Sequence, residues 1–385
     1  MVDTIAAPAR LQRQPAARPG LLARRRRWFA AAAFLLLAAP LVVGFVAPDS
    51  PSMVEREGRR FAPPPAAPTD WAGWRDLPAA TDAFLKDHFG LRHAMIQLHH
   101  DLTKPMLGFG NPDLLMGRDG RMFYQGDDLV RQSAGLVVRD ERVADTVAML
   151  VRMRDELAKR GIKFLVFSPP NSATVYNDDL PVWAQNKGRR TEYDLYLSQL
   201  AAHGITMVDL RPPLAAAKAA GKAYFTYDSH WTSAGAIAGF NAVVDADGHP
   251  DWKVDPNALG PEVRRTKLDV ARYFGTDQNL SEPTRELSLN GGTREADLSP
   301  GPMPNHVQAS GRPGPTVLVI GDSFTTDLFT TMLIQHVSRA IWINHDRCAF
   351  DWKWIDVYHP DEVWWGPTER FLNCKRDLWP ASLPR

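Results

Sequence analysis

A short apolar run that ends in Gly-Asp-Ser restricts the fold of this chain more than any other feature of its sequence. Residues 316–329 read TVLVIGDSFTTDLF. The run at 317–320 is short, rich in β-branched residues and followed by a small-residue turn, which is typical of a buried strand in a parallel sheet. From Asp327 onward the apolar residues have helical spacing. A strand, a turn and a helix in this order place Ser323 at the carboxyl edge of a sheet, where α/β proteins bind their ligands.

Two interpretations of Ser323 follow from this position. Its hydroxyl could act as a nucleophile, or it could only cap the helix that follows, as serine often does. A three-residue motif does not decide between them. The first interpretation requires a base elsewhere in the chain.

Helical and strand patterns alternate along much of the chain, which indicates parallel βαβ units with helices on the faces of a sheet. We therefore predict an α/β fold with a doubly wound parallel sheet. An amphipathic helix or helix pair is expected at 81–102, and a turn with a short aromatic strand at 117–128. The polar segment 248–314 supports no assignment. The other predicted helices cover 141–160 and 191–203, and the other predicted strands cover 162–170, 204–210, 340–344 and 362–366.

The amino end predicts export from the cytoplasm. Arg24 to Arg27 precede an uncharged segment at 28–47, which is long enough to cross a bilayer as a helix. Positive charge before this segment and acidic residues after it predict a cytoplasmic N-terminus. We interpret the segment as an uncleaved anchor, because Phe45 and Pro48 do not suit a cleavage site after Ala47. A cleaved export signal is the alternative.

These features divide the chain into four predicted parts and place it as a single-pass protein of the inner membrane, with its large domain in the periplasm. The parts are a disordered cytoplasmic tail at 1–23, the basic cluster and transmembrane signal-anchor at 24–47, a Pro-rich linker at 48–75 and a folded domain at 76–385.

Composition excludes some functions and leaves one question open. With 45 basic and 44 acidic residues the net charge is +1, which gives no electrostatic basis for a nucleic-acid partner. The sequence has neither a metal-ligand cluster nor a dinucleotide-binding glycine loop, so we expect no metal and no cofactor.

Cys348 and Cys374 lie in the part predicted to be exported. They could form a disulfide there, or remain two buried thiols.

A candidate base for Ser323 lies in the segment YFTYDSHWTSAGA at 224–236. A serine hydroxyl keeps its proton near neutral pH, so a neutral imidazole must accept that proton and a carboxylate must orient the ring. Asp228 and His230 could supply both groups from one loop. Alternatively, Asp228 caps the helix that begins near Thr232, and His230 is simply buried. The presence of the Gly-Asp-Ser turn in the same chain favours the catalytic interpretation.

At these residues the chain resembles the SGNH-hydrolase-like alginate O-acetyltransferase family, whose exported members acetylate bacterial exopolysaccharides. Four further stretches are similar to the pattern of that family, and with the two segments above they cover roughly residues 76–372. They are FLKDHFGLRHAMIQLHHDL at 84–102, GRDGRMFY at 117–124, VFSPPNSATVYNDDLP at 166–181 and HPDEVWWGPTERFL at 359–372.

The resemblance implies ping-pong acetyl transfer to a polysaccharide hydroxyl, with Ser323 as the nucleophile, His230 as the base and Asp228 as its orienting carboxylate. It also implies a multi-pass membrane acyltransferase as the partner that supplies the acetyl group. A carbohydrate acetylesterase with the same triad and a non-catalytic membrane-tethered assembly protein are the alternatives. The candidates for the oxyanion site or for substrate contact, besides the Ser323 amide, are Asn171, Asn344, Arg347 and Trp231.

Two departures from the family pattern bear on substrate contacts and leave the triad intact. Asn171 stands where we expect a lysine, and residues 120–123 read GRMF where the family has GWLF.

Overall fold

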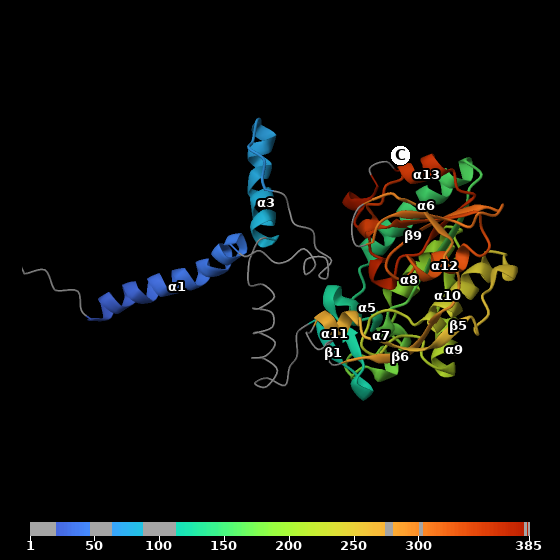
Figure 1. Ribbon diagram of the computed structural model, residues 1–385, viewed down its shortest axis with the longest axis horizontal. Coiled ribbons are helices and arrows are strands. Elements are labelled where there is room, and N and C mark those ends of the chain that lie inside the picture. Colours follow the sequence, from blue (N-terminus) through green and yellow to red (C-terminus); the bar gives the residue numbers. More distant parts are fainter. Residues whose placement is uncertain are drawn as a thin grey trace, which may run out of the picture. The chain divides into compact units, whose positions relative to one another are not determined.

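The computed structural model describes residues 21–46, 64–87, 113–273, 280–299, 303–380 and 383. By its internal contacts the chain divides into two units, Met1–His99 and His100–Arg385. The first unit contains helices α1 (Leu21–Val46) and α3 (Trp71–Asp87). The second contains the sheet and the helices that cover it, which Figure 1 labels.

The structure tests only part of the prediction for the amino end. The predicted span at 28–47 overlaps helix α1. Among the described residues, however, no helix has both the length and the apolar character needed to cross a membrane. The transmembrane helix that we predicted is therefore not found in the described part of the chain. The predicted tail at 1–23, most of the linker and most of the predicted helix at 81–102 lie outside the described residues.

The domain boundary that we placed between residues 75 and 76 falls within α3, which begins at Trp71. The limits of the four predicted parts therefore stay predictions.

The central sheet of the second unit has seven strands in the order β4-β3-β11-β9-β10-β8-β7. The first five are mutually parallel, and β8 and β7 continue the sheet in antiparallel pairing. The predicted α/β fold is thus confirmed, but the sheet is mainly and not wholly parallel as predicted, because two antiparallel strands arise from the segment left unassigned. The strands are β3 (Lys163–Ser168), β4 (Met207–Asp209), β7 (Thr293–Asp297), β8 (His306–Ala309), β9 (Thr316–Gly321), β10 (Arg339–Asn344) and β11 (Glu362–Trp365).

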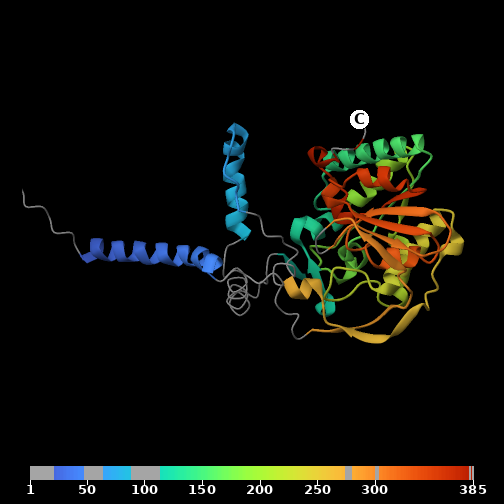
Figure 2. The ribbon, with the colours of Figure 1, turned by 45° about the horizontal axis from the view of Figure 1, so that its top comes forward.

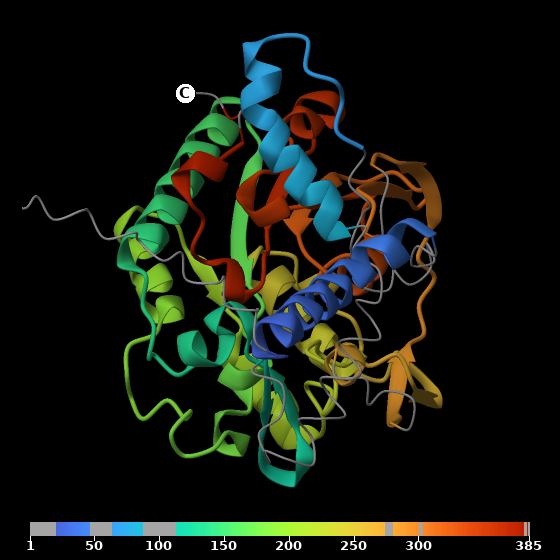
Figure 3. The ribbon, with the colours of Figure 1, turned by 90° about the vertical axis from the view of Figure 1, so that its left-hand side faces the viewer.

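Both faces of the sheet are covered, because its central strands carry apolar side chains on both sides. In β9, Val317 and Val319 pack into one core, while Leu318 and Ile320 pack into another on the opposite face. Figure 2 shows α6 along one face and the helices α10 and α12 along the other. In Figure 3 the long helix α6 is seen beside the strands that it covers. The bounds are α6 (Asp140–Lys159), α8 (Glu192–Ala202), α10 (Ser233–Ala246), α12 (Leu328–Leu333) and α13 (Lys353–Tyr358).

The other elements of the second unit are short. Strands β1 and β2 form one antiparallel pair, and β5 and β6 form another. Their bounds, with those of the remaining helices, are β1 (Leu114–Met116), β2 (Met122–Tyr124), β5 (Leu259–Arg265), β6 (Glu282–Leu287), α5 (Leu129–Ser133), α7 (Ser172–Val175), α9 (Arg211–Ala220) and α11 (Asp269–Tyr273).

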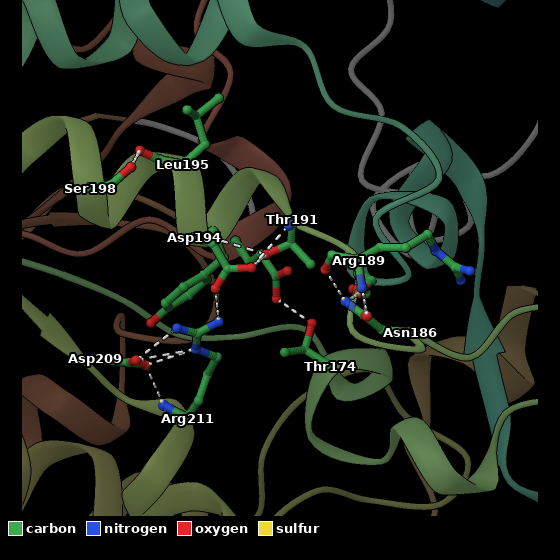
Figure 4. Close-up of polar contacts among 12 residues, drawn as sticks. Thr174, Asn186, Arg189, Thr191, Asp194, Leu195, Ser198, Asp209 and Arg211 are labelled. Atoms are coloured by element: carbon green, nitrogen blue, oxygen red, sulfur yellow. Dashed lines mark hydrogen bonds and ion pairs between the residues drawn. The ribbon is translucent and has the colours of Figure 1, made fainter.

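Local sequence explains the start of α8, which Figure 4 shows in detail. The Thr191 side chain accepts a hydrogen bond from the Asp194 amide, and the Asp194 carboxylate accepts one from the Thr191 amide, which is a capping box. The other oxygen of Asp194 accepts from Arg211, whose guanidinium also pairs with Asp209 at the end of β4. One arginine thus joins the end of a strand to the start of a helix.

Candidate active site

Ser323 lies in a tight turn that begins where β9 ends. A side chain at Gly321 would place its Cβ 2.0 Å from the Thr325 Oγ1, so only glycine fits there. Asp322 is buried and holds the turn from inside. Its Oδ1 accepts a hydrogen bond from the Phe324 amide at 3.0 Å, and its Oδ2 accepts from the amide and hydroxyl of Thr368 at 2.9 and 2.6 Å. The turn is therefore tied to the segment that follows β11.

The hypothesis that Ser323 only caps a helix is wrong. Asp327 is the N-cap residue of α12, which begins at Leu328. The Ser323 hydroxyl instead lies 2.7 Å from the Nε2 of His230.

His230 reaches Ser323 from a folded-back loop before α10. Backbone hydrogen bonds from Phe225 to His230 and from Thr232 to Ala223 close this loop. The Oγ1 of Thr232 then accepts from the Gly235 amide and caps α10. The capping role is therefore filled by Thr232 and not by Asp228, the residue considered for it above.

Asp228 contacts the other side of the imidazole ring. Its Oδ1 lies 2.7 Å from the Nδ1 of His230 and accepts the His230 amide at 2.9 Å. The side chain of Asp228 is buried. The predicted juxtaposition of Ser323 and His230, which are 93 positions apart, is confirmed, and Asp228 completes a serine–histidine–aspartate arrangement.

A second carboxylate, which the sequence analysis missed, lies on the same ring nitrogen. The Oδ2 of Asp269 is 3.4 Å from the His230 Nδ1. The Asp269 amide donates to the Oδ2 of Asp228 at 2.9 Å, and its carboxylate accepts from the amide and hydroxyl of Ser229 at 2.6 and 2.5 Å. Asp269 begins the short helix α11, in the segment without a sequence assignment. No local pattern marks it, because its partners are about 40 positions away.

These two carboxylates control the charge of the imidazole. Burial alone would lower the pKa of His230, but the hydrogen bonds and negative charges of Asp228 and Asp269 outweigh it and raise that pKa to about 10. The same contact lowers the pKa of Asp269, although burial opposes this. The site therefore strongly stabilises the imidazolium that forms when His230 takes a proton.

The apolar surroundings of the triad come from aromatic rings. The ring of Phe324, next to the nucleophile, lies 4.9 Å from the His230 ring and 5.2 Å from the Trp231 ring, measured between centroids. Trp231 is 2% exposed and stacks on Phe329 of α12. Its position supports a role in packing beneath the site rather than contact with a substrate.

The three remaining candidates lie near the carboxyl edge of the sheet in different settings. Asn171 follows β3 and is buried; its Nδ2 donates to Ser133 Oγ at 3.2 Å. Asn344 ends β10, in register with Gly321, and its Oδ1 accepts the Asp346 amide at 2.9 Å. Arg347 is exposed in a turn with positive φ. None of these contacts assigns a role, so the oxyanion assignments stay predictions.

Cys348 and Cys374 are paired in a disulfide, which decides between the two states left open by the sequence. The bond joins the turn after β10 to the C-terminal segment. Its loop is short, at a sequence separation of 26.

Two groups in the described residues have ligand atoms close enough together for a metal ion. One is the triad group of Asp228, His230 and Asp269, and the other is Asp247, His249 and Glu362. In the first, His230 directs one nitrogen to carboxylates and the other to a hydroxyl. In the second, Lys163 Nζ already lies 2.9 Å from Asp247 Oδ1. The chemistry that fits the first group is proton transfer from Ser323, which activates an oxygen nucleophile.

Comparison with known proteins gives related sequences and a related fold. Two curated proteins named probable alginate O-acetylase AlgJ are similar to this chain. The protein of Pseudomonas syringae pv. tomato is 28% identical over 160 residues, which cover 41% of this chain and 39% of the relative. The protein of Pseudomonas putida is 26% identical over 307 residues, which cover 71% of this chain and 75% of the relative. The match thus spans about two fifths of the length of the first relative.

Among solved structures, PatB1 of Bacillus cereus aligns with a TM-score of 0.50 at 11% identity, covering 69% of this chain and 98% of that chain. At this identity the likeness concerns the fold alone.

A family model described as the SGNH hydrolase-like domain of acetyltransferase AlgX matches residues 114–358. The matched region is more than half of the chain and contains the turn with Ser323, the loop with His230 and the helix with Asp269. The chain therefore belongs to the AlgX family of SGNH hydrolase-like acetyltransferases.

Proposed function

We propose that this protein transfers acetyl groups to hydroxyl groups of an exopolysaccharide through an acetyl-serine intermediate on Ser323. The observation that carries the proposal is the continuous contact from Ser323 Oγ through both nitrogens of His230 to Asp228, each at 2.7 Å. Membership of an acetyltransferase family supports the same reaction.

The first half-reaction loads the serine. His230 Nε2 accepts the hydroxyl proton as Ser323 Oγ attacks the carbonyl carbon of an acetyl ester. When the tetrahedral intermediate collapses, the bond from the carbonyl carbon to the leaving oxygen breaks. That oxygen takes the proton from His230 and leaves as an alcohol. Asp228 holds the ring in the orientation that this proton transfer requires.

The second half-reaction moves the acetyl group to the acceptor. A sugar hydroxyl gives its proton to His230 Nε2 and attacks the acetyl carbon on Ser323. The ester bond to Ser323 Oγ then breaks, and Oγ recovers the proton from His230. If water takes the place of the sugar, the product is acetate. This is the esterase alternative, which uses the same triad.

The proposal is less specific about the polysaccharide that accepts the acetyl group and the partner that supplies it. The relatives are named for alginate, and we extend to this chain only the broader class of an exopolysaccharide acceptor. We propose a multi-pass membrane acyltransferase as the partner that supplies acetyl groups.

We also propose that residues 76–385 act outside the cytoplasm. The basic cluster and apolar segment at 24–47 support this, and so does the disulfide between Cys348 and Cys374, since such bonds persist in oxidising compartments. Sequencing the N-terminus of the mature protein distinguishes a retained anchor from a cleaved signal. If a reporter that is active only in the cytoplasm gives a signal when fused after residue 385, export is contradicted.

The reaction is tested by incubating the purified protein with a small acetyl ester, with and without an oligosaccharide. Acetylated sugar supports transfer. Release of acetate alone, unchanged by the sugar, supports the esterase. A protein that turns over neither substrate would support the non-catalytic alternative and remove the proposed function.

A further inference from the structure

The tetrahedral intermediate of the proposed reaction carries a negatively charged oxygen that needs hydrogen-bond donors. Asn171, a candidate from the sequence, makes hydrogen bonds elsewhere. Its backbone amide donates to Glu369 Oε2 at 2.7 Å, and its side-chain Nδ2 donates to Ser133 Oγ. It also follows β3, which β11 separates from the nucleophile strand β9. Asn171 is thus poorly placed to act as a second donor beside the Ser323 amide.

Arg370 lies on the segment that is tied to the nucleophile turn. The amide and the hydroxyl of Thr368 both donate to Asp322, the residue before Ser323, and Arg370 follows two positions after Thr368. The Cζ of Arg370 lies 5.4 Å from the ring centroid of Phe324, the residue after Ser323. The guanidinium thus packs beside the turn that carries the nucleophile.

Within the described part of the chain, no carboxylate forms an ion pair with the side chain of Arg370. Its Nε is buried and has no hydrogen-bond partner among the described residues. Arg139 and Arg211, by contrast, pair closely with Glu192 and Asp209. A buried donor without an acceptor costs free energy, so the presence of one beside a nucleophile points to an acceptor that arrives with the reaction.

The charge of Arg370 acts on the groups around the site. Burial raises the pKa of Tyr224 and of Tyr273, and the positive charge of Arg370 opposes both increases. Tyr273 ends α11, the helix that begins with Asp269, and stacks on Tyr124 at 5.7 Å between ring centroids. Arg370 therefore lies within electrostatic reach of the aromatic side chains near the triad.

We propose that Arg370 is a catalytic residue whose guanidinium donates a hydrogen bond to the oxyanion formed on the acetyl group at Ser323. This inference rests on the proposed acetyl transfer. No further reactant is required, because Arg370 only stabilises the charge that the carbonyl oxygen gains when Oγ attacks and loses when the intermediate collapses.

The test uses the purified full chain and p-nitrophenyl acetate, a small neutral ester without any group for Arg370 to bind in the ground state. We expect Arg370→Gln to lower kcat by about 100-fold to 1,000-fold with KM nearly unchanged, as for the loss of one oxyanion donor. Arg370→Lys should lose less, since it keeps the charge. Arg370→Ala should regain part of its activity when ethylguanidinium is added, an effect that a purely structural role would not produce.

Two controls separate the possible failures. Arg294→Gln removes an arginine on the edge strand β7 and should leave kcat unchanged, and thermal midpoints verify that each variant is folded. If Arg370→Gln keeps wild-type kcat on the small ester while Ser323→Ala is inactive, the role of Arg370 is overturned and the proposed function stands. The role of Arg370 is also overturned, and the proposed function again stands, if Arg370→Gln only raises the KM for the polysaccharide acceptor. If Ser323→Ala keeps full activity, the proposed function itself fails.

Discussion

The carboxylate of Asp269 lies 3.4 Å from the Nδ1 of His230, the ring nitrogen that Asp228 contacts at 2.7 Å. The imidazole is therefore held by two carboxylates. Asp228, which is nearer to His230 in sequence, also makes the shorter contact. The two have different further partners: Asp228 accepts the amides of His230 and Asp269, and Asp269 accepts the amide and hydroxyl of Ser229. We expect their replacements to have different effects.

The first prediction concerns the pH dependence of activity. His230 must be neutral to accept a proton, and its pKa is raised to about 10, so kcat/KM should still increase with pH above neutrality. Asp269→Asn removes one negative charge and should shift this increase toward acid by about 1 pH unit. Asp228→Asn should instead lose most activity at every pH, because the ring is no longer held in the correct tautomer. A pH–rate profile of each variant checks this, and an unshifted profile for Asp269→Asn would contradict it.

The same raised pKa has a consequence for stability. A folded-state pKa above the unfolded value means that the charged ring stabilises the fold fully below about pH 6.5, and that this contribution is lost as the pH rises toward about 10. The thermal midpoint of Asp269→Asn should therefore depend less on pH across this window than that of the wild type.

Replacing Ser323 separates catalysis from folding. Ser323→Ala removes a hydroxyl that contacts His230 and caps no helix, so the thermal midpoint should hardly change while acetyl transfer falls by several orders of magnitude. His230→Ala should lose a similar factor, and the double variant should lose little more, because the residues act as a unit. The measurements are acetyl incorporation into polymer and thermal unfolding. Full activity of Ser323→Ala would refute the triad.

The disulfide predicts a redox-dependent stability. In the chain-entropy model, closing a loop at a sequence separation of 26 contributes about 3–4 kcal/mol. Replacing Cys348 and Cys374 together by serine should lower the free energy of unfolding by about this amount. Urea unfolding with and without reductant provides the measurement. Reductant should destabilise the wild type and leave the double variant unchanged; equal stability of the two proteins without reductant would contradict the prediction.

A buried glutamate predicts a loss of stability toward neutral pH. Burial raises the pKa of Glu369 to about 7, although hydrogen bonds from Thr174 and Asn171 oppose this. Between about pH 4.5 and 7 the unfolded chain releases this proton while the folded chain keeps it, so stability decreases as the pH rises. Glu369→Gln does not titrate. Unfolding curves at a series of pH values should show that Glu369→Gln gains stability relative to the wild type from about pH 5 to 8. A difference in the free energy of unfolding that does not change with pH would disprove the assignment.

Sequence patterns predicted the parts of this fold that are buried on both sides. The strands at 162–170, 340–344 and 362–366 are visible as apolar runs because helices cover both of their faces, and the helix α6 deviates from its prediction by one residue at each end. Ser323 and His230 were recognisable because each stands in a motif with a distinct local shape.

The missed parts lack such local signals. Strands β5 and β7 are largely exposed, so their residues are mostly polar and do not form apolar runs. Asp269 is an ordinary charged residue in sequence. Arg370 lies in the stretch at 359–372 that is similar to the family pattern, but nothing distinguishes it there from other charged residues. Their proximity to the triad depends on pairings across the fold, namely Asp269 with Ser229 and Thr368 with Asp322.

The two antiparallel strands at one side of the sheet also determine where local unfolding of the domain is easiest. Because β8 and β7 extend the sheet beyond β10, the strands that support the nucleophile turn have hydrogen-bonded neighbours on both sides. On this side of the sheet the edge strand is β7, whose residues include Arg294, Glu295 and Asp297. Local fraying at this edge breaks few buried contacts. The amides of β7 should therefore exchange with deuterated solvent before those of β9, which exchange only when the whole domain unfolds.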